Sequence, residues 1–271
     1  MTNIVIGAGS GMGASVARQL APRGPLVLAD VNVESAEKLA ADLGGDVKAR
    51  PCDVTDQAQV DALFAEVDDL DSLVHTAGVS NSMASGRRIL EVNLQGVERV
   101  IRAAEPKLHE GSVGVFVASQ SGYMVPESPE LFAAFLDPLR DGFLDELSGY
   151  FDIDDSTLAY QASKRGVHRL VRDHAKAWGR KGARIVSVSP GITDTPMGRG
   201  EEDAHPAMLK LIEASPSGRR GTPDEIAEVI SFVTSPAAAL LTGSDVLADG
   251  GMATILPRAG WDGKLRIPPT A

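Results

Sequence analysis

The sequence predicts an α/β fold with one doubly wound parallel sheet of about seven strands and helices on both of its faces. Three observations support this prediction. Short apolar segments alternate with segments of helical periodicity along nearly the whole chain. A glycine-rich turn follows the first apolar segment. Small and polar residues also follow the later apolar segments, where an open parallel sheet binds its ligand.

The composition favours one large domain over residues 1–271, with an insert at 123–158 and a tail at 257–271. The chain has 271 residues, 43% of them hydrophobic, and a net charge of −11. That charge disfavours a nucleic acid or an anionic membrane as partner. The single cysteine, Cys52, suits a reducing compartment. The first residues predict a strand and no signal peptide, and no apolar run is long enough to span a membrane. We therefore expect a cytoplasmic protein.

The first predicted strand, 3–6, runs into a turn that contains Gly7, Gly11 and Gly13 and then into a helix. Glycine allows a tight turn and a close approach of a phosphate, and the N-terminus of the helix attracts the anion. The turn also contains Ser10 and Met12. Its spacing differs from the common G-x-G-x-x-G pattern, and the alternative interpretation is a flexible turn. The position between a strand and a helix favours nucleotide binding.

Asp30 ends the second predicted strand, 25–29. A carboxylate there accepts hydrogen bonds from the ribose hydroxyls of an adenosine and repels a 2′-phosphate. No Arg or Lys stands beside it to reverse that preference. The sequence therefore predicts NAD and not NADP as cofactor. The alternative is that Asp30 caps the helix that starts near Val33.

Asp53 and Val54 follow a third predicted strand, 46–50. At a carboxyl strand end, the side chain of Asp53 has two possible roles. It can accept the amino group of the adenine, or it can cap the helix from Asp56. The residues alone leave both roles open.

Ala77 and Gly78 follow the predicted strand 72–75 and form a small-residue turn against which a cofactor can lie. His75 is interpreted as a strand-end residue, because no second ligand stands at metal spacing from it. The sequence therefore predicts no metal site.

The segment 88–109 has helical periodicity and predicts one long helix, which Asn93 interrupts on its apolar side. This Asn is either a satisfied buried amide or a site where the helix holds a water. Ser119 and Ser121 come just after the buried strand 113–118, so two hydroxyls stand at a carboxyl strand end.

Tyr160 and Lys164 lie four residues apart on the predicted helix 159–181, so they share one face. A fixed ammonium favours phenolate and lowers the pKa of a nearby tyrosine. Such a pair can exchange a proton with an alcohol or a carbonyl near neutral pH. The next predicted strand, 183–188, leads to Pro190, Gly191, Ile192 and Thr195 in a turn at another carboxyl end.

Together these motifs resemble those of the short-chain dehydrogenase/reductase family, which has a Rossmann-type fold, from Ile4 to about Gly251. The matches, in family order, are Gly7/Gly11/Gly13, Asp53, Ala77-Gly78, Asn93, Ser119, Tyr160-x-x-x-Lys164, Pro190-Gly191 and Asp249-Gly250-Gly251. The chain departs from the family at His75-Thr76, where two asparagines are usual, and at Ile6, where a hydroxyl residue is usual.

The resemblance implies a role for each candidate catalytic residue. Tyr160 would be the general acid/base, and Lys164 would lower its pKa and bind the nicotinamide ribose. Ser119 would donate to the substrate oxygen, with Ser121 as its rival. Asn93 would hold a water that links the lysine to solvent.

For the cofactor, the resemblance implies that Ile192 and Thr195 contact the carboxamide and the pyrophosphate. The expected function is transfer of a hydride between NAD and a secondary alcohol or ketone. The helical insert 123–158 contains Phe132, Phe135, Phe143 and Phe151, which we interpret as a mixture of self-packing and an apolar cap over the site.

The apolar insert suggests a sizeable hydrophobic substrate, such as a steroid, terpenoid or acyl compound. Its length is similar to that in the 3α-hydroxysteroid dehydrogenase/carbonyl reductase branch. The resemblance also implies a homodimer or homotetramer. The alternative functions are a non-catalytic, NAD-binding regulatory or scaffold protein on the same fold, and a lyase or epimerase that uses the same tyrosine–lysine pair.

Overall fold

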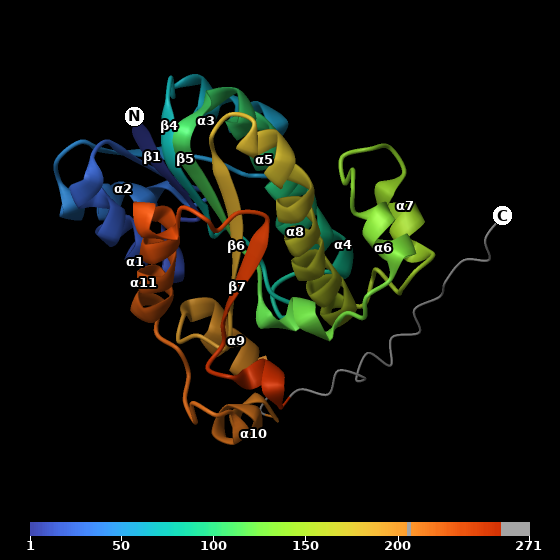
Figure 1. Ribbon diagram of the computed structural model, residues 1–271. Coiled ribbons are helices and arrows are strands. Elements are labelled where there is room, and N and C mark those ends of the chain that lie inside the picture. Colours follow the sequence, from blue (N-terminus) through green and yellow to red (C-terminus); the bar gives the residue numbers. More distant parts are fainter. Residues whose placement is uncertain (205–206, 256–271) are drawn as a thin grey trace.

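A computed structural model describes residues 1–204 and 207–255 and contains one seven-stranded sheet (Figure 1). Every neighbouring pair of strands is parallel, in the order β3-β2-β1-β4-β5-β6-β7. The strands are β1 (Thr2–Ile6), β2 (Leu26–Asp30), β3 (Val47–Pro51), β4 (Leu70–His75), β5 (Leu108–Val117), β6 (Arg184–Pro190) and β7 (Ser244–Ala248). The predicted fold class is therefore confirmed.

Helices cover both faces of this sheet (Figure 1). Buried side chains of β1 alternate between two cores: Ile4 and Ile6 face one, and Val5 faces the other. The first core also contains α3 (Gln57–Ala65), α4 (Gly86–Leu90), α5 (Gly96–Ala104) and α8 (Ser156–Gly179). The second contains α1 (Gly11–Leu20), α2 (Val33–Leu43) and α11 (Pro223–Thr234).

The strand order places a topological switch point between β1 and β4. The chain leaves β1 towards β2 and β3 and then crosses back to pair β4 with the other side of β1. A crevice forms where such connections part, at the carboxyl ends of the strands. The turn after β1 and the turn after β4 meet there, because the backbone N–H groups of Thr76 and Ala77 both donate to Ile6 O.

The prediction of one long helix over 88–109 is partly wrong. Its first part is α4, a π-helical turn at Glu91–Gln95 and then α5, and a 3₁₀ turn at Glu105–Lys107 follows. Pro106 lies in that last turn, where its missing N–H prevents a further α-helical hydrogen bond. Leu108 then begins β5 and is not the end of a helix.

The insert forms α6 (Pro129–Ala134) and α7 (Phe143–Ser148), which lie beyond α4 and α8 (Figure 1). Phe135, Phe143 and Phe151 are buried in the core, and Phe132 packs against it. A hydrogen bond of 2.7 Å from Gln95 to the carbonyl of Pro138 ties the insert to the helical segment that contains Asn93. The insert therefore extends the core.

At the carboxyl edge of the sheet, β6 leads into α9 (Pro196–Ala204) and α10 (Ala207–Ala214) (Figure 1). Short 3₁₀ turns complete the described chain at Ala21–Arg23, Gln120–Met124 (η4), Pro236–Ala238 and Met252–Thr254. The predicted tail at 257–271 lies outside the described residues. In the ranges 1–204 and 207–255, no helix is both long enough and apolar enough to cross a membrane.

Candidate active site

The turn after β1 depends on Gly7, Gly11 and Gly13 for its shape. Gly7 and Gly11 have φ angles of +86° and +52°, a region that L side chains rarely adopt. A Cβ on Gly13 would lie 2.0 Å from Gly7 O, so any side chain there would force the turn open. The N-cap residue of α1, Ser10, makes no side-chain hydrogen bond to the first turn of the helix. The backbone N–H groups of that turn are thus not capped by it and can bind an anion.

Thr76 holds this turn against the end of β4. Its hydroxyl lies 3.0 Å from both Ile6 O and Gly7 O, so the single hydroxyl proton can be shared between these two carbonyl oxygens. Ile6 has no hydroxyl of its own to offer at this point. Thr76 therefore supplies, from the neighbouring strand, a polar contact that the glycine turn itself lacks.

Asp30 is oriented by two backbone groups. Gly9 N–H donates to one carboxylate oxygen at 2.7 Å, and Asn32 N–H donates to the other at 2.8 Å. The helix α2 is capped by the side chain of Asn32, which accepts from Ser35 N–H. The alternative prediction, that Asp30 caps this helix, is therefore wrong.

Asp53 does not cap the next helix, because the N-cap of α3 is Asp56. One carboxylate oxygen of Asp53 accepts from the amide and the hydroxyl of Thr55, and the other lies 3.5 Å from the guanidinium of Arg88. Partial burial raises the pKa of Asp53, but the Thr55 hydrogen bonds and the Arg88 charge outweigh it and hold the pKa below its ordinary value. The carboxylate is thus fixed in its charged form.

These groups line one long groove with a volume of about 500 Å³. Its walls include eleven of the predicted cofactor-binding residues: Gly7, Ser10, Gly11, Met12, Gly13, Asp30, Asp53, Val54, Ala77, Gly78 and Thr195. The tight glycine turn, the helix N-terminus and the oriented carboxylate fit the phosphates and the ribose of a dinucleotide. The volume lies within the roughly 300–1,000 Å³ typical of ligand sites.

A second cavity of about 190 Å³ adjoins this groove, and the two share Met12, Thr195 and Met197 as lining residues. The predicted residues Pro190, Gly191 and Ile192 line the second cavity. Gly191 is required there, because a Cβ on it would lie 2.7 Å from the Cα of Asp249. The last strand's Asp-Gly-Gly end thus supports the turn after β6.

Tyr160 and Lys164 occupy the first half of α8, whose N-terminus is capped by Asp155. Tyr160 lines the smaller cavity. Lys164 is only 7% exposed, and its Nζ donates to the carbonyl of Val117 at 3.1 Å. The same Nζ lies 5.6 Å from the centre of the Tyr160 ring. The buried ammonium of Lys164 is therefore held close to the ring of Tyr160, behind the cavity wall.

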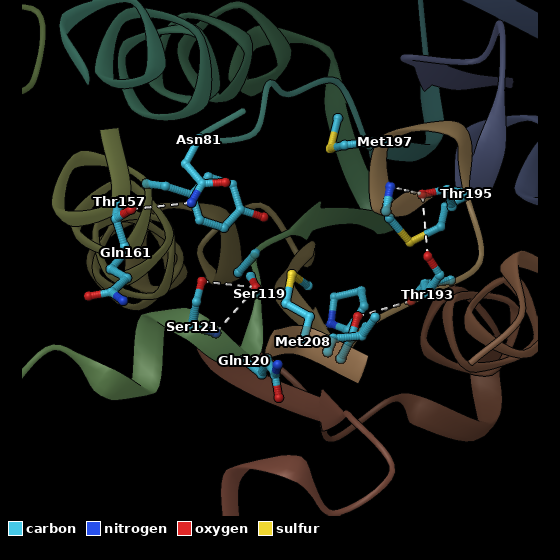
Figure 2. A pocket seen from close by; sticks show the side chains of 17 residues that line it. Asn81, Ser119, Gln120, Ser121, Thr157, Gln161, Thr193, Thr195, Met197 and Met208 are labelled. Carbon is cyan, nitrogen blue, oxygen red and sulfur yellow. Dashed lines mark hydrogen bonds between the residues drawn. The ribbon is translucent and has the colours of Figure 1, made fainter. Parts of the chain in front are cut away.

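Ser119 and Ser121 both line the smaller cavity, as Figure 2 shows. Ser119 is the N-cap of η4, and its Oγ accepts from Ser121 N–H at 3.2 Å and from Ser121 Oγ at 3.0 Å. Because Ser121 donates its hydroxyl proton to Ser119 Oγ, the hydroxyl proton of Ser119 is available for a hydrogen bond to a ligand. The geometry favours Ser119 over Ser121 as the donor.

Asn93 lies in the π-helical turn, and its amide is satisfied at both ends by Val79. Its Nδ2 donates to Val79 O at 2.8 Å, and its Oδ1 accepts from Val79 N–H at 2.9 Å. A Cβ on Gly78 would lie 3.1 Å from Asn93 Oδ1 and 3.7 Å from Lys164 Nζ, so the three residues meet closely. The side chain of Asn93 is thus a satisfied buried amide, which fixes the turn after β4.

Sequence reasoning missed several residues of the smaller cavity, namely Asn81, Gln120, Thr157, Met197 and Met208. Thr157 carried a usable signal, because it lies three residues before Tyr160 on the same helix face. The others come from loops and short helices whose direction no sequence period specifies. Among the described residues, no group of three or more His, Cys, Asp or Glu side chains could hold a metal ion.

A glycine turn at a helix N-terminus and an oriented carboxylate, beside a tyrosine–lysine pair, are the arrangement expected of a dinucleotide-binding oxidoreductase. Two family models match the chain: "short chain dehydrogenase" over residues 2–134 and "Enoyl-(Acyl carrier protein) reductase" over residues 148–253. D-threitol dehydrogenase of Mycolicibacterium smegmatis is 34% identical, with 92% of this chain and 91% of that protein covered. The chain belongs to the short-chain dehydrogenase/reductase family, whose members use NAD(H) or NADP(H).

Two further comparisons agree with this family. Cis-4-hydroxycyclohexanecarboxylate dehydrogenase of Sinomonas cyclohexanicum is 32% identical, over 93% of this chain and 96% of that protein. A solved structure of a short-chain dehydrogenase/reductase (glucose/ribitol dehydrogenase) from Brucella melitensis superimposes with a TM-score of 0.75 at 27% identity. It covers 93% of this chain and 96% of that chain.

The predicted hydroxysteroid branch gains little from these comparisons. The 3-alpha-hydroxysteroid dehydrogenase/carbonyl reductase of Comamonas testosteroni is 27% identical, over 93% of this chain and 96% of that protein. It is thus less similar than relatives named for other alcohols.

The cap interpretation of the insert is also wrong, because none of its four phenylalanines lines either cavity of the site.

Proposed function

We propose that the protein is an NAD-dependent dehydrogenase of secondary alcohols, which also works in reverse as a carbonyl reductase. One observation carries the proposal: Tyr160 and Ser119 line a single cavity that opens onto the dinucleotide groove, with the buried ammonium of Lys164 directly behind the phenol. This arrangement offers a proton acceptor and a hydrogen-bond donor to the same oxygen of a substrate.

The residues of this chain handle the proton and the position of the substrate. Tyr160 takes the hydroxyl proton during oxidation and returns it during reduction. Lys164 favours the phenolate by its charge at short range. Ser119 donates to the substrate oxygen, a contact that strengthens as negative charge develops there. When bound, the nicotinamide ring supplies the hydride acceptor or donor.

In this proposal Asn93 contributes indirectly to proton transfer between Lys164 and solvent. Its side chain holds the turn at Gly78 and Val79 next to Lys164, and its helical turn holds a water that passes the proton from the lysine to solvent. Ile192 and Thr195 contact the carboxamide and the pyrophosphate, and Ala77 and Gly78 lie against the cofactor backbone.

The preference for NAD is proposed on the charge and orientation of Asp30. Its two oxygens, fixed by backbone N–H groups, suit the two ribose hydroxyls and repel a 2′-phosphate. Arg88 lines the same groove, but its guanidinium is engaged by Asp53 and Glu91. Wild-type kcat/KM should be at least tenfold higher with NAD than with NADP, and Asp30→Ala should narrow the ratio. A wild-type preference for NADP would refute this part.

The substrate is proposed as a secondary alcohol because the more similar relatives are named for threitol and for a hydroxylated cyclohexane. The expectation of a sizeable apolar substrate depended on the insert's phenylalanines. Their place in the core removes its basis, and it is not part of this proposal.

Replacing the proposed acid/base tests the function. Tyr160→Phe keeps the ring and removes the hydroxyl, so we expect turnover to fall by roughly 10²–10⁴-fold or more while NAD binding, followed by fluorescence titration, stays within about twofold. Ser156→Ala, one turn earlier on α8 and outside both cavities, is the matched control. If wild type binds NAD and oxidises no alcohol in a broad panel, the protein is the non-catalytic NAD-binding alternative.

We also propose a cytoplasmic homodimer or homotetramer. The buried, unpaired thiol of Cys52 suits a reducing compartment. Light scattering at several concentrations would show a mass of two or four chains, and a concentration-independent monomer would contradict the proposal.

A further inference from the structure

The smaller cavity limits the size of the substrate. Its volume of about 190 Å³ is below the roughly 300–1,000 Å³ of sites that hold drug-sized ligands. Part of its wall, at Pro190, Gly191, Ile192 and Thr195, belongs to the proposed cofactor site. The cavity is open to solvent at Thr157, and the volume left within it for a substrate suits a molecule of few carbon atoms.

The rest of the wall combines apolar side chains, among them Met197 and Met208, with uncharged polar ones. It carries the hydroxyls of Ser119, Ser121 and Thr157 and the amides of Asn81 and Gln161, beside Tyr160. Among the residues that the structure describes, no Lys, Arg, Asp or Glu lines this cavity. A carboxylate, phosphate or ammonium on the substrate would lose water there without a counter-charge, which disfavours charged substrates. The amides and hydroxyls instead suit a ligand with several hydroxyl groups.

Asn81 and Thr157 line the cavity together and hydrogen-bond to each other. Figure 2 shows them on one side of the cavity, apart from Ser119 and Ser121. Nδ2 of Asn81 donates to Thr157 Oγ1 at 3.3 Å, which leaves the threonine its own proton to donate. Thr157 lies one helical turn before Tyr160, so the two side chains share one face of α8 and line the same cavity.

We propose that the substrate is a small, uncharged, linear polyol, and that Asn81 and Thr157 read a hydroxyl next to the one that is oxidised. This inference rests on the proposed alcohol dehydrogenase function and narrows its substrate class. Asn81 and Thr157 are thus specificity residues, and Tyr160 and Ser119 act on whichever alcohol is bound. A site that hydrogen-bonds a hydroxyl favours a substrate that carries it over an analogue that lacks it. Thr157 is exposed and Asn81 half-buried, so water can replace part of the missing contact and the expected discrimination is moderate.

The test compares a linear four-carbon polyol, threitol, with cyclohexanol, which has one hydroxyl and an apolar body. Wild type should have the higher kcat/KM for threitol. Thr157→Val, nearly equal in shape, and Asn81→Leu should each lower the ratio of kcat/KM for threitol to that for cyclohexanol by about 3-fold or more. Ser156→Ala, the neighbouring hydroxyl outside the cavity, should leave the ratio unchanged.

The outcomes separate this inference from the proposed function. If wild type prefers cyclohexanol to threitol and to polyols of five and six carbons, or if neither variant moves the ratio, the polyol inference is overturned and the alcohol dehydrogenase stands. If wild type binds NAD but oxidises neither class, both are overturned.

Discussion

The folded protein should lose stability in mild acid because it buries two neutral histidines. His75, at the end of β4, is 1% exposed, and burial together with the charge of Lys164 lowers its pKa to about 3. Burial also lowers the pKa of His168 to about 4, although the neighbouring Asp245 carboxylate opposes this shift. Above pH 6.5, the ordinary histidine pKa, both imidazoles are neutral in the folded and the unfolded chain. Below it, only the unfolded chain takes up the protons, so stability falls as pH falls.

The two pKa values give the size of this effect. One pKa unit corresponds to about 1.4 kcal/mol, so lowering the pH from 7 to 4.5 costs the folded state about 3 kcal/mol through His75. His168 adds a similar amount, which gives about 5 kcal/mol for both histidines. That sum is comparable with the whole stability of many domains, about 5–15 kcal/mol.

Urea unfolding at pH 7 and pH 4.5 measures this loss for wild type and for His75→Leu. The variant should lose about 3 kcal/mol less than wild type between the two pH values, since its titrating imidazole is gone. Each protein is compared with itself at pH 7, so the packing cost of the substitution cancels. Val74→Ala, the neighbouring core position of β4, should weaken the protein equally at both pH values. An equal pH dependence of wild type and His75→Leu would refute the reasoning.

Three shorter predictions concern other parts of the structure. Gly13→Ala places a methyl group 2.0 Å from Gly7 O, so calorimetry should show a lower Tm and NAD titration a loss of at least tenfold in affinity; tight NAD binding by this variant would contradict the turn geometry. Tyr123→Phe removes the 2.7 Å hydrogen bond from η4 to Asp245, a partly exposed contact, and should cost about 1 kcal/mol in urea unfolding, whereas no change would show that water replaces the hydroxyl fully. Burial raises the pKa of the Cys52 thiol to about 12, so iodoacetamide should modify the native protein at pH 8 far more slowly than the urea-unfolded chain, and equal rates would contradict its burial.

The fold and the cofactor groove follow from local patterns in the sequence. Hydrophobic periodicity marks each strand and helix, and a glycine between them is needed wherever the backbone must turn tightly or approach another segment. Gly7 and Gly13 illustrate this. A Cβ on Gly7 would clash with Ala77 at the end of the neighbouring strand β4, and a Cβ on Gly13 would clash with the carbonyl of Gly7. The parallel sheet then brings Asp30 and Ala77 to one edge, since all carboxyl strand ends meet there.

The errors arose where a pattern fixed what a residue is but not what it meets. Helical periodicity did not reveal the π-helical turn at Asn93, because five residues of altered hydrogen bonding barely change the order of apolar positions. The preference of Asp for helix N-caps applied equally to Asp30, Asp53 and Asp56, and only the last one caps its helix. Which carboxylate caps depends on backbone angles that the side-chain type does not specify.

The sequence by itself determined the order of strands and helices, the glycine turn and the spacing of Tyr160 and Lys164, because these depend on residues close together along the chain. Tertiary structure alone decided the character of the substrate cavity. The phenylalanines of the apolar insert joined the core that also contains residues of α4, α5 and α8, while Asn81 and Thr157, distant in sequence, came together to line the cavity. Burying an apolar side chain lowers the free energy whichever surface removes it from water. The apolar composition of the insert therefore could not indicate which surface it would cover.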